Sequence, residues 1–269
     1  MDQDLLRARY GDHSPDTAAL NDVMRLLLNH RSCRHFTDEP LPPGLIEALI
    51  AAAQSAATSS NTQTFSVVVV EDAARRARLA ELSNRQAFIA QAPVFLCWIA
   101  DSSRLYRMGE RHQQKLEGLD YLESFIVAAV DAALAAQNCV IAAESMGLGT
   151  VYVGGLRSKP EDVARELALP PGAVALFGMS LGWPDPAWAG QIKPRLPQQL
   201  VLHREQYGVA GEAEAVARYD QALAAFSENQ GMGPQAWTPR MLSRVGTPQA
   251  LSGRHRMVEM LRNLGFPLK

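Results

Sequence analysis

The segment 119–146 constrains the fold of this chain more than any other part of its sequence. Between positions 124 and 143 it carries a single charged residue, Asp131, and alanine is its commonest residue. A helix of this length is long enough to cross a membrane, but Asp131, Gln137 and Asn138 are costly in hydrocarbon. We therefore expect a central core helix whose small side chains let neighbouring helices pack closely, and no membrane association.

The whole chain has the composition of a globular protein with a large core. It has 269 residues, of which 47% are hydrophobic and 20% charged, and a formal net charge of −2. A disordered chain needs fewer apolar residues and more net charge, so this class is excluded. Three separated cysteines, Cys33, Cys97 and Cys139, form no CxxC pair and indicate free thiols in a reducing cytoplasm. The polar N-terminus lacks the apolar core of a signal peptide, which also favours the cytoplasm.

Basic residues gather in the C-terminal tail, although the chain as a whole is slightly acidic. Positions 231–269 hold six Lys or Arg residues and one acidic residue, Glu259. Such a tail is compatible with a nucleic acid, with a nucleotide phosphate or with the acidic surface of a partner subunit. No nucleic-acid-binding motif accompanies it, so we favour the last two and expect no nucleic-acid partner.

Hydrophobic patterns predict an irregular succession of strands and helices. Strands are expected at 65–70, 93–100, 151–153 and 174–181. Helices are expected from Ser14-Pro15-Asp16 to about His30, after the prolines at 42 and 43, and at 73–82, 212–229 and 256–264. A box from Ser158 to Glu161 is expected to cap one more helix. This order favours an α+β sandwich over a doubly wound sheet. Within it we expect an N-terminal extension 1–13, a main domain 14–230 and a basic C-terminal arm 231–269, which belongs to the same domain or to a dimer interface.

The run 178–182 matches the GxSxG pattern of serine hydrolases, with Ser180 in the place of the nucleophile. A nucleophile elbow requires a helix directly after the strand. Pro184 and Pro186 prevent such a helix, so the hydrolase is a disfavoured alternative and an inner strand is expected. No dinucleotide or P-loop glycine motif is present, and the histidines have no metal-ligand spacing, so no metal site is expected.

Two short basic clusters suggest instead a pocket for a phosphate group: His30-Arg31-Ser32-Cys33-Arg34 and Lys193-Pro194-Arg195. Guanidinium groups match phosphate oxygens well, and charge-assisted hydrogen bonds are strong. The run Thr58–Gln63 offers amides and hydroxyls that can read the edge of a heterocycle. Gly154-Gly155 lets a planar group approach main-chain N–H groups. Together they predict a bound nucleotide that no Rossmann loop holds.

These stretches, with several others, resemble the FMN-dependent nitroreductase family, specifically its branch of larger NADPH-linked nitroreductases and flavin reductases. The matching stretches occur in the family's order and cover roughly positions 20–230. They are HRSCRHFTDEP at 30–40, TSSNTQ at 58–63, AQN at 136–138, AAESMGLG at 142–149, VYVGGLR at 151–157, GWP at 182–184 and KPRLP at 193–197.

The resemblance implies a fold, an assembly and a set of cofactor-binding residues. The fold is a sandwich of a mainly antiparallel sheet with surrounding helices, and the assembly is an intertwined homodimer with the long helix at its interface and an FMN touched by both subunits. Arg34 and Gly155 would tune the flavin, and no side chain would act as a catalytic acid or base. The residues expected to bind FMN are His30, Arg31, Ser32, Cys33, Arg34, Thr58, Ser59, Ser60, Asn61, Gln86, Tyr152, Val153, Gly154, Gly155, Lys193 and Arg195.

The activity implied is ping-pong hydride transfer from NAD(P)H through FMN to a small flat acceptor such as a nitroaromatic, a quinone or free flavin. The physiological acceptor stays open, and an FMN-binding protein with a ligand-sensing role is the alternative. Gln230 stands where this branch carries an arginine for the NADPH phosphate, so the choice between NADPH and NADH also stays open. Arg240 and Arg244 are candidate replacements. No role follows from the sequence for Met1–His13.

Overall fold

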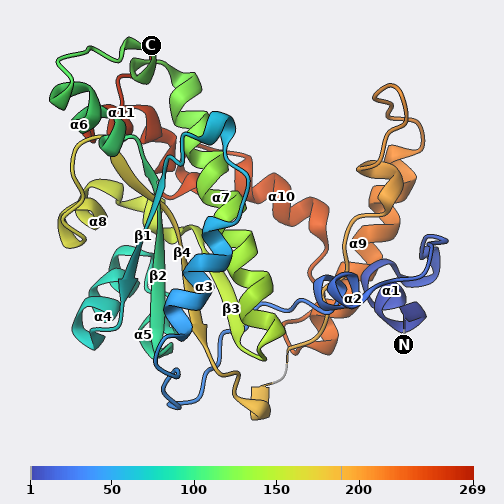
Figure 1. The fold of residues 1–269 in the computed structure, drawn as a ribbon. Helices are drawn as coiled ribbons and strands as arrows, with labels where there is room; N and C mark the ends of the chain where they lie inside the picture. The colour runs from blue at the N-terminus through green and yellow to red at the C-terminus, as the bar shows by residue number, and fades with distance from the viewer. Residues whose placement is uncertain (1, 189) are drawn as a thin grey trace. The chain divides into compact units, whose positions relative to one another are not determined.

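The computed structural model describes residues 2–188 and 190–269 and divides the chain into two compact units. Unit 1 comprises Met1–Arg31 and Gly190–Leu251, and unit 2 comprises Ser32–Ala189 and Ser252–Lys269. Both units therefore combine segments that lie far apart in the sequence (Figure 1).

A four-stranded antiparallel sheet forms the centre of unit 2, in the order β1-β2-β4-β3. All four predicted strands are present within two residues at each end, and the mainly antiparallel α+β fold is confirmed. The strands are β1 Phe65–Val70, β2 Val94–Asp101, β3 Gly149–Val153 and β4 Ala173–Gly182.

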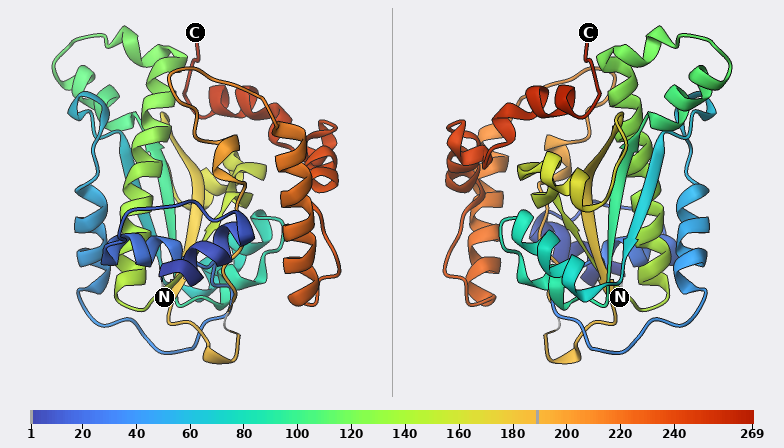
Figure 2. Two further views of the ribbon diagram at one scale, coloured as in Figure 1. Left: turned by 90° about the vertical axis from the view of Figure 1, so that its right-hand side faces the viewer. Right: turned by 90° about the vertical axis from the view of Figure 1, so that its left-hand side faces the viewer.

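Helices cover both faces of this sheet because its inner strands are apolar on both sides. Leu96 and Trp98 of β2 point into the same core as α3 and α7, whereas Phe95 and Cys97 point into the core shared with α4, α5 and α8. Figure 2 shows the sheet between these two helical layers. The helices are α3 Leu45–Gln54, α7 Leu122–Ser145, α4 Ala73–Leu82, α5 Ala87–Gln91 and α8 Pro160–Glu166.

The predicted central helix is α7. Its alanine-rich face, including Ala132, Ala135 and Ala136, is fully buried, and Ala135 and Ala136 share a core with the sheet and α3. Among the helices of the described residues, α7 is the one whose length and composition would allow it to cross a membrane. Small side chains on the buried face allow close packing, which explains why alanine dominates this helix.

Main-chain hydrogen bonds join the last residue of unit 2 to the start of α7. The N–H of Lys269 donates to the carbonyl of Asp120 at 2.9 Å, and the N–H of Leu122 donates to the carbonyl of Lys269 at 3.3 Å. Two further helices of this unit are α6 Ser103–Arg111 and α11 Met257–Asn263. The last residues of the basic tail are therefore fastened to the start of α7 (Figure 1).

Unit 1 is helical in its regular parts. The guanidinium of Arg25 forms a bidentate pair with Asp2, with Nε–Oδ1 at 2.8 Å and Nη2–Oδ2 at 3.2 Å, which joins α1 to α2. The main-chain N–H of Thr238 donates to Asp220 at 2.7 Å, which joins α10 to α9. The helices of this unit are α1 Asp2–Tyr10, α2 Asp22–Leu28, α9 Glu212–Asn229 and α10 Trp237–Val245.

Two predicted helix starts are wrong. The helix expected from Ser14 begins only at Asp22, where the side chain of Asn21 accepts a hydrogen bond from Met24 N–H at 2.9 Å. The helix expected to be capped by Ser158 is capped instead by Lys159, without a side-chain hydrogen bond. The hydroxyl of Ser158 accepts from the Asn84 amide at 3.1 Å, so a long-range contact replaces the local cap. Helices α1, α5, α6 and α10 were not predicted, since their apolar patterns are short.

Candidate cofactor site

Part of the first basic motif lies along β3, at the edge of the sheet in unit 2. Ser32 forms a parallel bridge with Thr150, and the N–H of Cys33 donates to the carbonyl of Thr150 at 2.8 Å. A Cβ on Gly149 would lie 2.7 Å from the Cys33 sulfur, so this glycine allows the close approach. Burial raises the pKa of the Cys33 thiol, which is therefore neutral at pH 7. Residues 32–34 are thus held beside β3.

Gly155, two residues beyond the end of β3, packs directly against Ser83 and Gln86. A Cβ on Gly155 would lie 2.7 Å from the Ser83 carbonyl oxygen and 2.8 Å from the Gln86 Nε2. The Gln86 amide donates to this same carbonyl at 3.1 Å. The sequence predicted Gln86 and Gly155 as flavin ligands on separate grounds, and the structure brings them into contact.

Arg34 joins the same place through an aromatic ring. Its guanidinium carbon lies 5.8 Å from the centroid of the Phe88 ring. Phe88 is in the first turn of α5, the helix whose N-cap is Gln86. We call this group the β3-end cluster, and it consists of Arg34, Gln86, Phe88 and Gly155. It presents a cation, an amide and a main-chain segment without side chains.

Tyr152 and Val153 contribute to this region chiefly through their main chain. The Val153 side chain is buried in the core, and the Tyr152 ring packs edge-on against Phe177, with a centroid distance of 5.4 Å. Burial raises the pKa of the Tyr152 hydroxyl above its usual range. The neutral phenol donates to Gln137 at 3.4 Å, so its role here is structural.

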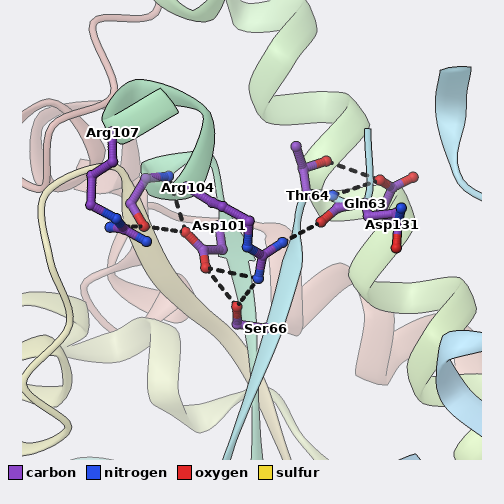
Figure 3. Close-up of polar contacts among 8 residues, drawn as sticks. Gln63, Thr64, Ser66, Asp101, Arg104, Arg107 and Asp131 are labelled. Atoms are coloured by element: carbon purple, nitrogen blue, oxygen red, sulfur yellow. Dashed lines mark hydrogen bonds and ion pairs between the residues drawn. The ribbon is translucent and has the colours of Figure 1, made fainter. Parts of the chain in front are cut away.

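The Thr58–Asn61 segment forms a tight turn that is fastened to α7 and α6. Asp131 accepts from the N–H of Ser59 at 3.1 Å. It also accepts from the N–H of Thr64 at 3.1 Å, and Arg104 donates to the carbonyl of Gln63 at 2.9 Å (Figure 3). Ser60, Asn61 and Gln63 have positive φ angles of 48°, 57° and 50°. Such angles cost energy in residues with side chains, so the turn depends on these anchors.

Among the described residues, no hydrogen bond or ring contact links this turn to the β3-end cluster. The structure therefore places the predicted flavin residues of unit 2 in two separate groups. Sequence reasoning did not assign a role to Asp131. Its signal was the single carboxylate in an apolar helix, which must find hydrogen-bond donors when it is buried.

The remaining predicted ligands, His30, Arg31, Lys193 and Arg195, belong to unit 1 and are called the basic cluster. Arg31 donates to the carbonyl of Gly190 at 3.1 Å. The Tyr219 hydroxyl on α9 donates to the carbonyl of Pro194 at 3.2 Å, which fixes the second motif between its two cations. Burial raises the pKa of Tyr219, against the opposing effect of Arg195 and Arg240 nearby. Arg195 is exposed, and its guanidinium has no hydrogen-bond partner within the described residues.

Comparison with known proteins identifies the family. The profile of the Nitroreductase family matches residues 27–183, and that of the Nitroreductase family C-terminal domain matches residues 193–269. The chain belongs to the nitroreductase family.

Relatives match this nitroreductase-family chain over almost its whole length. An oxygen-insensitive NADPH nitroreductase of Salmonella typhimurium is 41% identical over 242 residues, covering 88% of this chain and 98% of the relative. An NAD(P)H-dependent FMN reductase of Bacillus subtilis is 37% identical, covering 93% and 100%. The solved structure of the NADPH:FMN oxidoreductase from Vibrio harveyi complexed with NAD+ has a TM-score of 0.82 and 32% identity, covering 93% and 100%.

The serine of the GxSxG match has a structural place in this nitroreductase-family fold. Ser180 lies inside β4 opposite Phe95 and Val151 and is fully buried. A Cβ on Gly178 would lie 2.0 Å from the Phe95 ring, so the small residue serves close packing. Because strand β4 continues through Ser180, no nucleophile elbow is formed. Within the described residues, no group of three His, Cys, Asp or Glu side chains is placed to hold a metal ion.

Proposed function

We propose that this chain is an FMN-dependent NAD(P)H oxidoreductase that reduces small, flat, electron-poor acceptors such as nitroaromatics, quinones or free flavin. The proposal is supported by relatives named NADPH nitroreductase and FMN reductase, which match more than four fifths of this chain. The similar NADPH:FMN oxidoreductase from Vibrio harveyi, solved in complex with NAD+, supports both a flavin and a nicotinamide nucleotide. No feature of the sequence or the fold favours a ligand-sensing role.

The β3-end cluster is the observation that carries the proposal. Gln86 offers an amide to the polar edge of a heterocycle, and Gly154 and Gly155 offer main-chain N–H groups and carry no side chains of their own. Arg34 adds a positive charge at the same place. A planar ring that gains negative charge on reduction fits such a set of donors.

We propose that the basic cluster of unit 1 binds the phosphate of FMN. The basic cluster includes Arg31, Lys193 and Arg195, and the Arg195 guanidinium is not committed to another described residue. Arginine and lysine are the side chains best suited to a phosphate dianion. We assign the phosphate and ribityl chain to His30, Arg31, Ser32, Lys193 and Arg195, and the ring to the β3-end cluster with Tyr152, Val153 and Gly154.

When bound, FMN would accept a hydride from NAD(P)H and pass two electrons to the acceptor, which is chemistry that protein side chains do not supply. The chain's own residues bind and orient the ring and stabilise negative charge on it. Arg34 does so as a cation and Gly155 as a main-chain donor. Donor and acceptor would use the same place in turn. No side chain would be required as a catalytic acid or base, because the cofactor supplies the chemistry.

We also propose that the working form is a homodimer. One side of α7 and its N-cap carries large apolar residues that are each 46–52% exposed: Tyr121, Leu122, Ile126, Val130 and Leu134. Most of them are spaced by four residues and so form one apolar row. A second copy placed on this row would bring its own Thr58–Asn61 turn, which is fastened to α7, toward the interface. Both subunits would then contribute to each flavin.

The environment we propose for the enzyme is the cytoplasm, without nucleic-acid or membrane partners. All three cysteines are free, and two of them, Cys97 and Cys139, are buried in apolar surroundings that raise their thiol pKa. Cysteines that are not paired in disulfides are typical of proteins in a reducing compartment.

Anaerobic reduction of the FMN-loaded protein tests the proposal. The protein is expected to turn yellow with FMN and to bleach on addition of NADPH or NADH, and then to recover its colour with a quinone or nitroaromatic. Protein that stays colourless with FMN would refute the flavin site. Bound flavin that neither nucleotide bleaches would support the sensing alternative instead.

One pair of variants connects this test to the site. Arg34→Met should slow bleaching at least tenfold, because the cation near the ring is lost. Arg111→Met, which removes an exposed cation from the end of α6, should leave the rate unchanged.

A further inference from the structure

The N-terminal helix α1 carries one buried cation. Arg9 is 5% exposed, although it lies on a nine-residue helix at the beginning of the chain. An arginine is rarely buried to this degree unless hydrogen bonds replace its hydration. The hydrogen-bond partners of Arg9 therefore indicate which parts of the chain this helix holds in place.

The Arg9 guanidinium donates to three main-chain carbonyls. Two belong to the end of α2 and the residue that begins the first basic motif: Nε donates to Leu28 at 3.0 Å and Nη2 to His30 at 2.6 Å. The third is in the second basic motif, where Nη1 donates to Lys193 at 2.8 Å. One planar group thus contacts the main chain of both motifs, which are 163 positions apart in the sequence.

The main chain of Arg9 adds a fourth contact in the same direction. Its carbonyl accepts the N–H of Arg195 at 2.8 Å. Arg9 therefore contacts three of the four residues of the basic cluster or their immediate main chain: His30, Lys193 and Arg195. The helix itself is held in place by the Arg25–Asp2 pair and the buried Leu6.

We propose that Arg9 is a positioning residue that sets the spacing of the basic cluster for the phosphate of the cofactor. The rigid fork of a guanidinium fixes the directions of its hydrogen bonds, so the two motifs cannot shift relative to each other without breaking them. Its buried charge also adds to the positive potential that attracts a dianion. Helix α1, which lies in a stretch without a role assigned from the sequence, thereby becomes part of the phosphate-binding end of the site. This inference rests on the proposed function, since it assumes that the cluster binds the phosphate of FMN.

Riboflavin, which is FMN without its phosphate, separates this role from a general effect on folding. The test measures dissociation constants of the apo-protein for FMN and for riboflavin by quenching of flavin fluorescence. Arg9→Met should weaken FMN binding about tenfold, equivalent to about 1.4 kcal/mol, and leave riboflavin binding unchanged. Arg7→Met, which removes an exposed cation of the same helix, should change neither constant.

Two outcomes would overturn the inference. Either Arg9→Met binds FMN as the wild type does, or it loses FMN and riboflavin equally, in which case Arg9 is purely structural. If Arg9→Met does not fold, Arg9→Lys decides: it keeps the charge but not the fork, and an FMN-to-riboflavin affinity ratio equal to that of the wild type would refute the positioning role. Wild-type protein that binds neither flavin would instead contradict the proposed function.

Discussion

The carboxylate of Asp131, in the middle of α7, accepts two hydrogen bonds from Thr64, one from its main-chain N–H at 3.1 Å and one from its hydroxyl at 2.9 Å (Figure 3). Its other oxygen accepts the N–H of Ser59 at 3.1 Å. One buried side chain therefore fixes both ends of a turn whose middle residues have positive φ angles. The position of this turn depends on the helix rather than on contacts within the turn.

Replacing Asp131 should destabilise the protein strongly. In Asp131→Asn one acceptor oxygen becomes an N–H₂ group that faces N–H and O–H donors, and the hydrogen bonds to a charged acceptor are lost. We expect the free energy of unfolding in urea to fall by about 2–4 kcal/mol. Glu123→Gln, which removes an exposed carboxylate from the first turn of the same helix, should cost less than about 1 kcal/mol. Equal stability of the two variants would show that Asp131 does not anchor the turn.

The strands and the central helix were predictable from the sequence because their signals are local. An apolar run of β-branched and aromatic residues specifies a buried strand, and the alanine-rich run specifies a helix, wherever each comes to lie. The start of the helix expected from Ser14 was predicted wrongly because a second local start signal lies close by. A serine, a proline and an acid form a good start signal, but Asn21 seven residues later caps the helix that actually packs.

The anchors of the candidate site were not predictable because they act over long sequence distances. Arg9 donates to a carbonyl 184 positions away, and Asp131 reaches a turn about 70 positions before it. Among the 26 basic residues, no local pattern distinguishes Arg9 from the exposed ones. Asp131 stands out as the single carboxylate of an apolar run, but the sequence does not show which distant donors it binds. The close packing at Gly155 was easier to foresee, because a glycine pair after a strand indicates that another group approaches the main chain there.

Adding a methyl group at Gly155 should disturb the β3-end cluster. In Gly155→Ala the new Cβ would meet the Ser83 carbonyl oxygen at 2.7 Å and the Gln86 amide at 2.8 Å, so the main chain or Gln86 must move. We expect a loss of stability of about 1–3 kcal/mol and weaker binding of both FMN and riboflavin, measured by fluorescence titration. Gly118→Ala, where no atom lies within 4 Å of the new Cβ, is the matched control. Unchanged riboflavin affinity in Gly155→Ala would argue against a ring site here.

The acid stability of unit 2 should depend on Asp101. Burial alone would raise its pKa, but hydrogen bonds from Ser103 and Ser66 and the Arg104 guanidinium at 3.9 Å outweigh it, so the pKa lies below its usual value. A carboxyl whose pKa is lowered by folding stabilises the protein above its unfolded pKa of about 3.9 and loses this contribution as the pH falls through its folded pKa.

Urea unfolding at a series of pH values tests this dependence. At pH 7 Asp101→Asn should be clearly less stable than the wild type, and the difference should shrink steadily below about pH 4. Asp38→Asn, at an exposed position of the same unit, should match the wild type throughout. A stability difference for Asp101→Asn that is the same at pH 3 and pH 7 would contradict the assignment.

Charge on the apolar row of α7 should separate the proposed dimer. Leu134 is 46% exposed in the single chain, and a glutamate in its place would be buried without a partner in the interface. Leu134→Glu is therefore expected to sediment as a monomer at concentrations where the wild type is a dimer, and to bind FMN more weakly because each site lacks the second copy's turn. Met108→Glu, which alters an exposed apolar residue of α6, should remain dimeric. A wild-type chain that is monomeric at all concentrations would refute the dimer.

Arg240 should decide how well NADPH competes with NADH. Gln230 supplies no cation for the extra phosphate, and of the two candidate replacements Arg244 is committed to the carbonyl of Ala250 at 2.6 Å. Arg240 is exposed on α10 and has no hydrogen-bond partner within the described residues. Losing one charge-assisted contact to the phosphate should raise the KM for NADPH about tenfold in Arg240→Met and leave the KM for NADH unchanged. Arg204→Met, at another exposed cation of unit 1, should alter neither value. Equal increases in the KM for NADPH and for NADH would mean that Arg240 affects the site generally. An unchanged KM for NADPH would show that Arg240 does not bind its extra phosphate.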